Sequence, residues 1–215
     1  VAALEQLGQR HPWIDTTRAG MWGHSGGGNA TTAAMLRYPQ VYKVGVAQAG
    51  NHDNLTYEDD WAERYHGLLE KKDDGTSNYT GQDNASQAKN LQGKLFLIHG
   101  MMDDNVPVQS TLQVVDALMK ANKDFDLLLL PHGRHNVGVD PSYVMRRRWD
   151  YFVQHLLGAQ PRARCRGARR RRARRGAATA HAAGRHQQPQ PAHLRSQPAK
   201  YLRPAAAHPG GSHRG

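Results

Sequence analysis

Short apolar runs alternate with amphipathic stretches along the first three quarters of the chain. Four runs have the length and residue types of strands, and glycine, proline or polar residues bound them. The stretches between them repeat apolar positions at helical spacing. Strands that alternate with helices favour a parallel sheet with helices on both faces, so we predict an α/β fold with a doubly wound, mostly parallel sheet. The predicted strands are Arg18–Gly23, Tyr42–Ala47, Lys94–His99 and Phe125–Leu130.

Five stretches are predicted to be helical. The second ends before Pro39, which cannot continue a helix. The last should place Tyr143, Trp149, Phe152 and Leu156 on its apolar side. Residues 50–92 form a long polar excursion in which periodicity is weaker. The predicted helices are Val1–Gln9, Ala30–Tyr38, Tyr57–Leu69, Val108–Met119 and Ser142–Leu157.

Charge divides the chain into two parts. All 18 acidic residues and 15 of the 29 basic ones lie in residues 1–158, which carry a net charge of −3. Residues 159–215 hold the other 14 basic residues, no acid, and no Val, Ile, Phe, Met or Trp. Such a composition cannot bury enough apolar surface to offset its conformational entropy. We therefore predict a folded domain over residues 1–158 and a disordered Arg/Ala/Pro/His-rich tail over residues 159–215.

The tail contains a dense arginine run over residues 169–175. Such a run can bind phosphates through counterion release, which would make the tail a polyanion-binding or nucleic-acid-binding segment. It is also typical of a solvated charge run, or of GC-rich DNA translated in a wrong frame. Because the folded part has a net negative charge, the basic character of the whole chain does not indicate a nucleic-acid-binding domain.

The number of cysteines and the hydropathy of the chain exclude several kinds of site and segment. Cys165 is the single cysteine, so no disulfide can form within the chain. No Cys/His spacing typical of a zinc site is present, and no apolar run approaches the 18–20 residues or so that span a bilayer. The chain begins with Val and shows no signal peptide, so we expect it to begin inside a longer gene product.

The strongest chemical signal is the glycine-rich segment Gly23-His24-Ser25-Gly26-Gly27. This G-x-S-x-G lies between a predicted strand and a predicted helix, which is the context of a nucleophile elbow. Ser25 is then a candidate nucleophile, and the backbone N–H of Gly26 is a candidate oxyanion donor at a helix N-terminus. A glycine-serine turn without chemistry is the alternative interpretation.

A serine nucleophile needs a base and an acid that orients the base. Asp103 and Asp104 follow the third predicted strand, and either could be the acid while the other caps the next helix. His132 and His135 follow the fourth, and either could be the base. Serine, aspartate and histidine thus occur in the order of the α/β-hydrolases, each after a strand.

These motifs resemble the prolyl oligopeptidase family of serine peptidases, nearest its dipeptidyl peptidase IV-like branch. The resemblance covers residues 1–158 and none of the tail. Residues 1–158 are similar to the C-terminal part of the family's catalytic α/β-hydrolase domain. The residues that carry it are Trp22-Gly23-His24-Ser25-Gly26-Gly27-Gly28, Glu63-Arg64-Tyr65, His99-Gly100, Asp103-Asp104-Asn105-Val106 and Arg146-Arg147-Arg148-Trp149-Asp150-Tyr151-Phe152.

The resemblance implies a triad of Ser25, Asp103 and His135. The family pattern favours His135 over His132 as the base, although Asn136 stands where the family usually has glycine. His24 and His99 are assigned to loop packing rather than catalysis.

The resemblance also implies a substrate site. Tyr57 and Trp61 would line the pocket for the residue before the scissile bond, and Asn105 would bind a substrate carbonyl. The i, i+4 spacing of Tyr57 and Trp61 also fits two aromatic rings that simply pack on one helix face.

The implied function is that of a serine-type exopeptidase or oligopeptidase, with a dipeptidyl peptidase as one form, that makes an acyl-enzyme on Ser25. Its partner is a peptide substrate, and no metal or cofactor is implied. Related enzymes are often periplasmic or secreted. A serine esterase of the same fold, or a polyanion-binding protein with an idle triad, is the alternative.

The resemblance implies parts that this sequence does not contain. The family takes a second oxyanion donor from a loop upstream of the elbow, and it also has a propeller domain. We therefore expect the 215-residue chain alone to be a poor catalyst.

Overall fold

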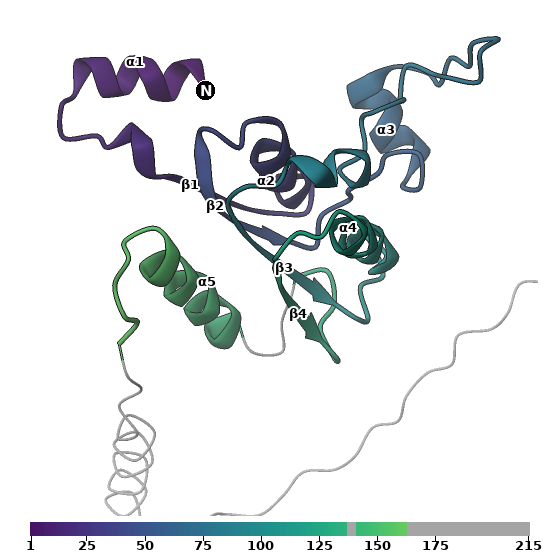
Figure 1. The fold of residues 1–215 in the computed structure, drawn as a ribbon. Helices are drawn as coiled ribbons and strands as arrows, with labels where there is room; N and C mark the ends of the chain where they lie inside the picture. Colours follow the sequence, from purple (N-terminus) through teal and green to yellow (C-terminus); the bar gives the residue numbers. More distant parts are fainter. Residues whose placement is uncertain (137–140, 163–215) are drawn as a thin grey trace, which may run out of the picture. The chain divides into compact units, whose positions relative to one another are not determined.

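Four parallel strands form a sheet at the centre of the molecule, in the order in which they occur along the chain (Figure 1). The computed structural model describes residues 1–136 and 141–162. Each strand begins and ends within one residue of its prediction, and all three pairings are parallel, which confirms the predicted sheet. The strands are β1 (Ala19–His24), β2 (Tyr42–Gln48), β3 (Lys94–Gly100) and β4 (Asp126–Leu130).

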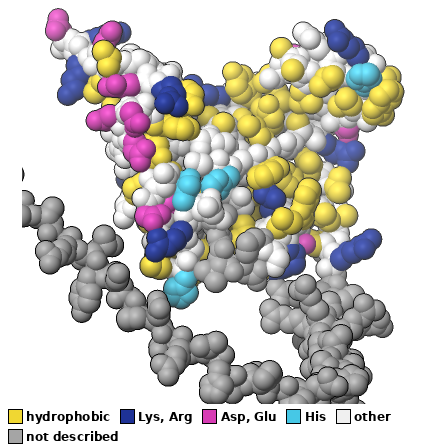
Figure 2. Space-filling view, turned by 180° about the vertical axis from the view of Figure 1, so that it is seen from behind, with side chains coloured by type: hydrophobic (Ala, Val, Ile, Leu, Met, Phe, Trp, Pro, Cys, Tyr) yellow, Lys and Arg dark blue, Asp and Glu magenta, His cyan; other side chains and the backbone are white. Residues whose placement is uncertain are grey.

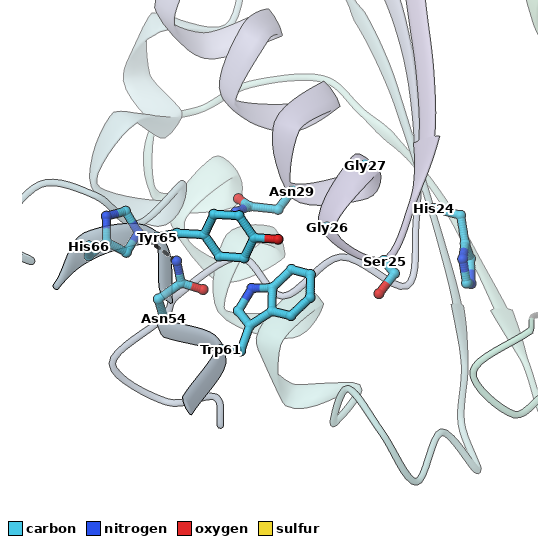
Figure 3. A pocket seen from close by; sticks show the side chains of 9 residues that line it. All are labelled: His24, Ser25, Gly26, Gly27, Asn29, Asn54, Trp61, Tyr65 and His66. Carbon is cyan, nitrogen blue, oxygen red and sulfur yellow. Dashed lines mark hydrogen bonds between the residues drawn. The ribbon is translucent and has the colours of Figure 1, made fainter. Parts of the chain in front are cut away.

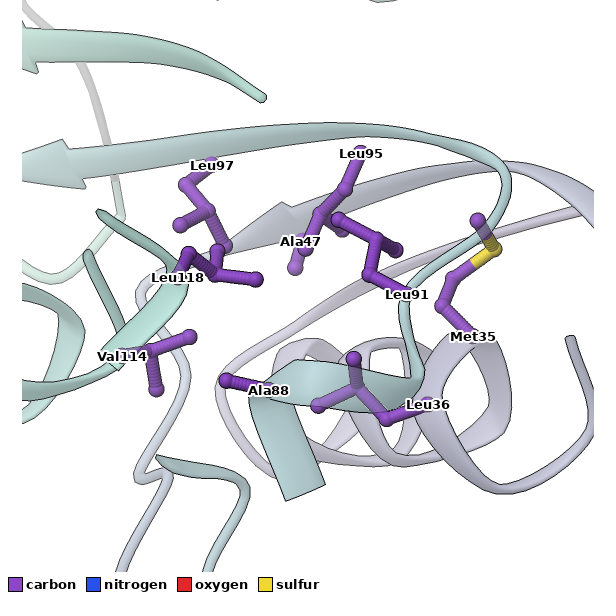
Figure 4. Close-up of a cluster of buried hydrophobic side chains, with 9 residues drawn as sticks. All are labelled: Met35, Leu36, Ala47, Ala88, Leu91, Leu95, Leu97, Val114 and Leu118. Atoms are coloured by element: carbon purple, nitrogen blue, oxygen red, sulfur yellow. The ribbon is translucent and has the colours of Figure 1, made fainter. Parts of the chain in front are cut away.

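Helices cover both faces of the sheet (Figure 1). On one face, α2 (Gly26–Arg37), the 3-10 helix η2 (Ala85–Asn90) and α4 (Gln109–Lys120) pack over β2 and β3. Figure 4 shows the buried cluster that they form. Its members are Met35, Leu36, Ala47, Ala88, Leu91, Leu95, Leu97, Val114 and Leu118.

The opposite face is covered by α5 (Pro141–His155). Because side chains alternate along a strand, Phe96 and Ile98 of β3 point to this face while their neighbours point to the first. Val44 and Val46 of β2 lie with them, since they too occupy alternate positions of a strand. The sheet is therefore doubly wound.

Two predicted helices differ from the observed ones at their ends. Helix α2 begins at Gly26, four residues earlier than predicted, because the glycines of the elbow form its first turn. Helix α3 (Asp59–His66) is shorter than the predicted Tyr57–Leu69 and ends at Gly67, whose φ of 77° favours glycine.

The apolar side of α5 also differs from the prediction. Trp149 is 58% exposed, whereas Val144 and Tyr151 are buried against the sheet. The α5 register places Val144 and Tyr151, seven residues and two turns apart, on the face that meets Phe96 and Ile98. The prediction for Phe152 and Leu156 is correct, since both pack against this cluster.

The first helix, α1 (Ala2–Arg10), is present as predicted but has no buried residue. A short 3-10 helix, η1 (Thr16–Arg18), connects it to β1. The predicted tail falls almost wholly on residues 163–215, which lie outside the described residues. Among the residues that the structure describes, no helix is long and apolar enough to cross a membrane.

Candidate active site

Three side chains meet at the carboxyl ends of β1, β3 and β4. The Nε2 atom of His135 lies 3.0 Å from the Oγ atom of Ser25, and its Nδ1 atom lies 2.9 Å from Oδ2 of Asp103. The loops that carry these residues leave the same edge of the sheet because the strands are parallel. The structure thus brings together the three residues that the resemblance implied.

The backbone at Ser25 has the geometry of a nucleophile elbow. Its φ of 57° and ψ of −124° lie in a region that non-glycine residues rarely adopt. Its N–H donates to the carbonyl of Gln48, at 2.9 Å, while its own carbonyl accepts from Gly28 and Asn29 in the first turn of α2. A Cβ atom on Gly23 would overlap the backbone of Gly27, so glycine is required where the strand and the helix cross.

Asp103 is held as a buried, ionised carboxylate. Its side chain has no exposed surface, and its Oδ1 accepts from the N–H groups of Asn105, at 3.0 Å, and Val106, at 2.9 Å. Burial by itself would raise the pKa of this carboxyl. The hydrogen bonds from His135 and from the two backbone N–H groups outweigh that effect and hold the pKa of Asp103 below its ordinary value.

The alternative acid and base take no part in this contact. Asp104 is exposed and pairs with Arg134 at 2.5 Å, which links the loop after β3 to the loop after β4. The expectation that the second aspartate caps the next helix is wrong, because α4 begins at Gln109 and has no side-chain cap. His132 is exposed to solvent.

Several contacts hold the His135 loop in place. The Nε2 atom of His24 lies 2.6 Å from the carbonyl oxygen of His135, and the two imidazole rings are 4.8 Å apart. The N–H of Met102 donates to the carbonyl of Gly133 at 2.9 Å. His24 thus contacts the His135 loop and also lines the pocket described below, whereas His99 is fully buried.

The N–H of Gly26 lies at the N-terminus of α2, next to Ser25. The bonds to the Ser25 carbonyl come from Gly28 and Asn29, so the N–H of Gly26 precedes the intrahelical pattern. The helix dipole adds positive potential at the same place.

A pocket of about 580 Å³ opens beside Ser25 (Figure 3). Ser25 and His24 lie at one end of it, and Asn54 and His66 lie at the other, with Trp61 and Tyr65 between them. The pocket is lined by His24, Ser25, Gly26, Gly27, Asn29, Asn54, Trp61, Tyr65 and His66.

The predicted substrate residues are placed differently from one another. Trp61 lines the pocket and lies over Gly26. Tyr57 does not line it, but its ring meets Trp61 edge-on at 6.3 Å, and its hydroxyl donates to Oδ1 of Asn105 at 2.9 Å. Burial and the nearby charges of Glu58, Asp103 and Asp60 raise the pKa of Tyr57, so this hydroxyl keeps its proton.

Six residues that line the pocket were not predicted as site residues: His24, which was assigned to loop packing, Gly27, Asn29, Asn54, Tyr65 and His66. The signal for Tyr65 was present, because it continues the i, i+4 series of Tyr57 and Trp61, and its ring lies 4.9 Å from that of Trp61. Nothing in the local sequence marks Asn54, whose amide nitrogen lies 2.7 Å from Nε2 of His66, the last residue of α3.

A parallel sheet with a nucleophile elbow, and with Asp and His on the loops that follow later strands, defines an α/β-hydrolase. The family model described as "prolyl oligopeptidase family" matches residues 1–159. The chain belongs to the prolyl oligopeptidase family, as the elbow and the aspartate segment predicted. Its fold is the C-terminal part of the α/β-hydrolase domain.

Individual relatives come from the dipeptidyl peptidase branch. Venom dipeptidyl peptidase 4 of Vespa velutina is 34% identical over 154 residues, which are 69% of this chain and 20% of that protein. Human dipeptidyl peptidase 8 is 29% identical over 73% of this chain and 17% of its own length. The crystal structure of Porphyromonas gingivalis dipeptidyl peptidase 4 matches with a TM-score of 0.65 and 30% identity, over 72% of this chain and 22% of that one. The chain thus spans about a fifth of the length of these relatives.

Within residues 1–136 and 141–162, no three His, Cys, Asp or Glu side chains are grouped so that they could hold a metal ion.

Proposed function

We propose that this chain carries the nucleophile, base and acid of a serine peptidase. The observation that carries the proposal is the unbroken contact from Ser25 Oγ to His135 Nε2 and from His135 Nδ1 to Asp103 Oδ2. The family assignment supports peptides as the substrate class. The low pKa of Asp103 keeps its carboxylate charged, which holds the proton of His135 on Nδ1 and leaves Nε2 to accept.

The proposed reaction proceeds through an acyl-enzyme. His135 Nε2 takes the hydroxyl proton as Ser25 Oγ bonds to the carbonyl carbon of the peptide. The oxyanion that forms accepts a hydrogen bond from the Gly26 N–H. When the carbonyl reforms, the C–N bond breaks, and the amine leaves with the proton from His135. Water then repeats the sequence on the ester, releasing the acid and free Ser25.

The pocket beside Ser25 would take the side chain of the residue before the scissile bond. Its walls are the rings of Trp61 and Tyr65, its far end is polar, with Asn54 and His66, and Asn29 adds a further polar side chain. A flat apolar side chain would stack on the indole. A side chain with a hydrogen-bonding group could reach the polar end.

Asn105 would bind a carbonyl of the substrate from the opposite side. Its Oδ1 already accepts from the Tyr57 hydroxyl, so the N–H groups of the amide are left to donate. Because Tyr57 also contacts Trp61, one residue links this amide to the pocket wall. We further propose release of dipeptides, in line with the names of the related dipeptidyl peptidases.

The test is covalent labelling of the 215-residue chain with a fluorophosphonate probe, followed by peptide mapping of the labelled residue. Label on Ser25, and its loss in Ser25→Ala, is the expected result. Label that persists in Ser25→Ala would place the nucleophile elsewhere.

The substrate class is tested with two further pairs of compounds. Matched amide and ester substrates distinguish a peptidase from an esterase. Dipeptidyl phosphonates with a free or an acetylated amino terminus test dipeptide release, since equal labelling by both would argue against recognition of that terminus.

A further inference from the structure

One buried histidine beside the proposed triad has no part in the mechanism above. His99 lies near the end of β3, and its side chain is fully buried. Its Nδ1 atom is 2.7 Å from the hydroxyl of Thr111 in α4, and its Nε2 atom is 3.0 Å from the carbonyl of Val106. The same Nε2 atom lies 3.2 Å from Oδ2 of Asp103.

These partners fix the tautomer of His99. A carbonyl oxygen can only accept, so the Nε2 atom facing Val106 must carry a proton. Burial lowers the pKa of His99, which makes the ring neutral near pH 7. The Nδ1 atom is then an acceptor, and the Thr111 hydroxyl donates to it.

The Asp103 carboxylate therefore lies between two imidazole rings. Its Oδ2 is 2.9 Å from Nδ1 of His135 and 3.2 Å from Nε2 of His99. Its Oδ1 is occupied by the two backbone N–H groups of the loop. A carboxylate with no exposed surface cannot be stabilised by water, so each donor beside it contributes to keeping it charged.

We propose that His99 is a positioning residue for Asp103. Its Nε2–H holds the Val106 carbonyl, which fixes the turn over residues 103–106. The same N–H also holds the Asp103 carboxylate oxygen that orients His135. The proposal rests on the proposed function, because it acts through the same triad. Besides His135, the titratable groups near this pair are His52, whose pKa the neighbouring His99 helps to lower, and Tyr57, whose pKa the Asp103 charge helps to raise.

Two substitutions of His99 distinguish the contribution of its Nε2–H group from that of the ring's volume. In His99→Gln the amide N–H can reach the position of Nε2, whereas in His99→Asn it reaches only the position of Nδ1. Both variants bury a polar amide, so they are matched in that cost. Thr111→Val removes the partner of Nδ1 and leaves the contact to Asp103, which makes it the control on the other side of the ring.

The first readout is an NMR titration of the Asp103 carboxyl carbon in the 215-residue chain. We expect the midpoint to rise by about one pH unit in His99→Asn, and to stay near the wild-type value in His99→Gln and Thr111→Val. An unchanged midpoint in His99→Asn, or an equal rise in the Gln variant, would overturn the proposal. Because this titration needs no turnover, it decides the role of His99 even if Ser25 proves not to be a nucleophile.

The second readout is the rate constant of fluorophosphonate labelling, measured against pH and normalised to the fraction of molecules that can be labelled. A slower rate and a shifted acid limb in His99→Asn, both restored in His99→Gln, are expected of a positioning residue. A merely structural role would lower only the fraction of chain that can be labelled, and that outcome would count against the proposal. Failure of the proposed function would show separately, as wild-type chain that does not label at Ser25.

Discussion

Single side chains decide the chemistry of the site, and the two histidines after β4 show how. His135 bridges Ser25 and Asp103, whereas His132 is exposed to solvent a few residues away. His135→Ala should lower the labelling rate by a factor on the order of 10² to 10⁴, which is the typical contribution of a general base. His132→Ala is the matched control and should label near the wild-type rate. The reverse pattern would assign the base to His132.

A second buried histidine makes stability depend on pH. His52 is 2% exposed, its Nδ1 lies 3.0 Å from the amide nitrogen of Asn84, and its Nε2 has no hydrogen-bond partner among the described residues. Burial, aided by nearby His99, lowers the pKa of His52 from 6.5 to about 3. Between these values the unfolded chain binds a proton that the folded chain excludes, so stability falls as pH falls.

We therefore expect the free energy of unfolding to decrease from pH 6.5 toward pH 3, by at most about 1.4 kcal/mol per pH unit from His52. Urea unfolding of the wild type and of His52→Gln at several pH values measures this. The variant should show a shallower slope, with the remainder coming from groups such as His99, whose pKa is also lowered. An identical slope in both proteins would contradict the buried neutral state of His52.

At the scale of elements, the crossing of β1 and α2 determines where Ser25 is held. A Cβ atom on Gly23 would overlap the carbonyl of Gly27, whereas a Cβ atom on Gly27 would meet no heavy atom within 4 Å beyond its chain neighbours and the nearby backbone of α2. The two glycines therefore form a matched pair in one elbow. One is needed for close approach, and the other is replaceable on steric grounds.

Gly23→Ala should destabilise the chain by several kcal/mol or prevent folding, because the backbone of α2 must move to admit a methyl group. Gly27→Ala should leave stability equal or raise it by about 0.5–1 kcal/mol, since alanine is the better helix former. Thermal unfolding of both variants provides the comparison. Equal melting temperatures would show that α2 can shift on β1 without cost.

At the scale of the whole molecule, the strands of the sheet are buried to different extents. The central strands β2 and β3 carry the buried cores, while β1 and β4 are edge strands with exposed positions. Figure 2 shows a broad gathering of hydrophobic side chains on one face. Trp22 of β1 is 50% exposed, with the guanidinium of Arg148 3.6 Å above its ring. The fold of the described residues thus depends mainly on its two inner strands.

The division of the chain near residue 158 predicts that the C-terminal segment is dispensable for the fold. Leu157, Gly158 and Ala159 are exposed, and residues 159–215 contain almost no side chain able to join a core. Truncation after Gly158 should leave the melting temperature and the labelling rate at Ser25 unchanged. Differential scanning fluorimetry and the labelling assay measure both. A fall of several degrees would show that the segment packs on residues 1–158.

The sequence by itself determined the elements that local periodicity specifies. Apolar runs bounded by glycine and proline placed all four strands within one residue, because strand patterns depend on neighbours along the chain. The elbow was visible for the same reason, since its glycines and serine are contiguous. The helix ends were less certain, because glycines that favour a turn in isolation form the first turn of α2 once β1 is in place.

The tertiary structure alone decided which distant side chains meet. Asp103 and Asp104 are equivalent by local pattern, and only packing turns the first toward His135 and the second toward Arg134. The same holds for Asn54, which reaches the pocket from the loop after β2. Their positions depend on loops that converge from different strands at one edge of the sheet, and contact across such loops follows from the fold rather than from spacing along the chain.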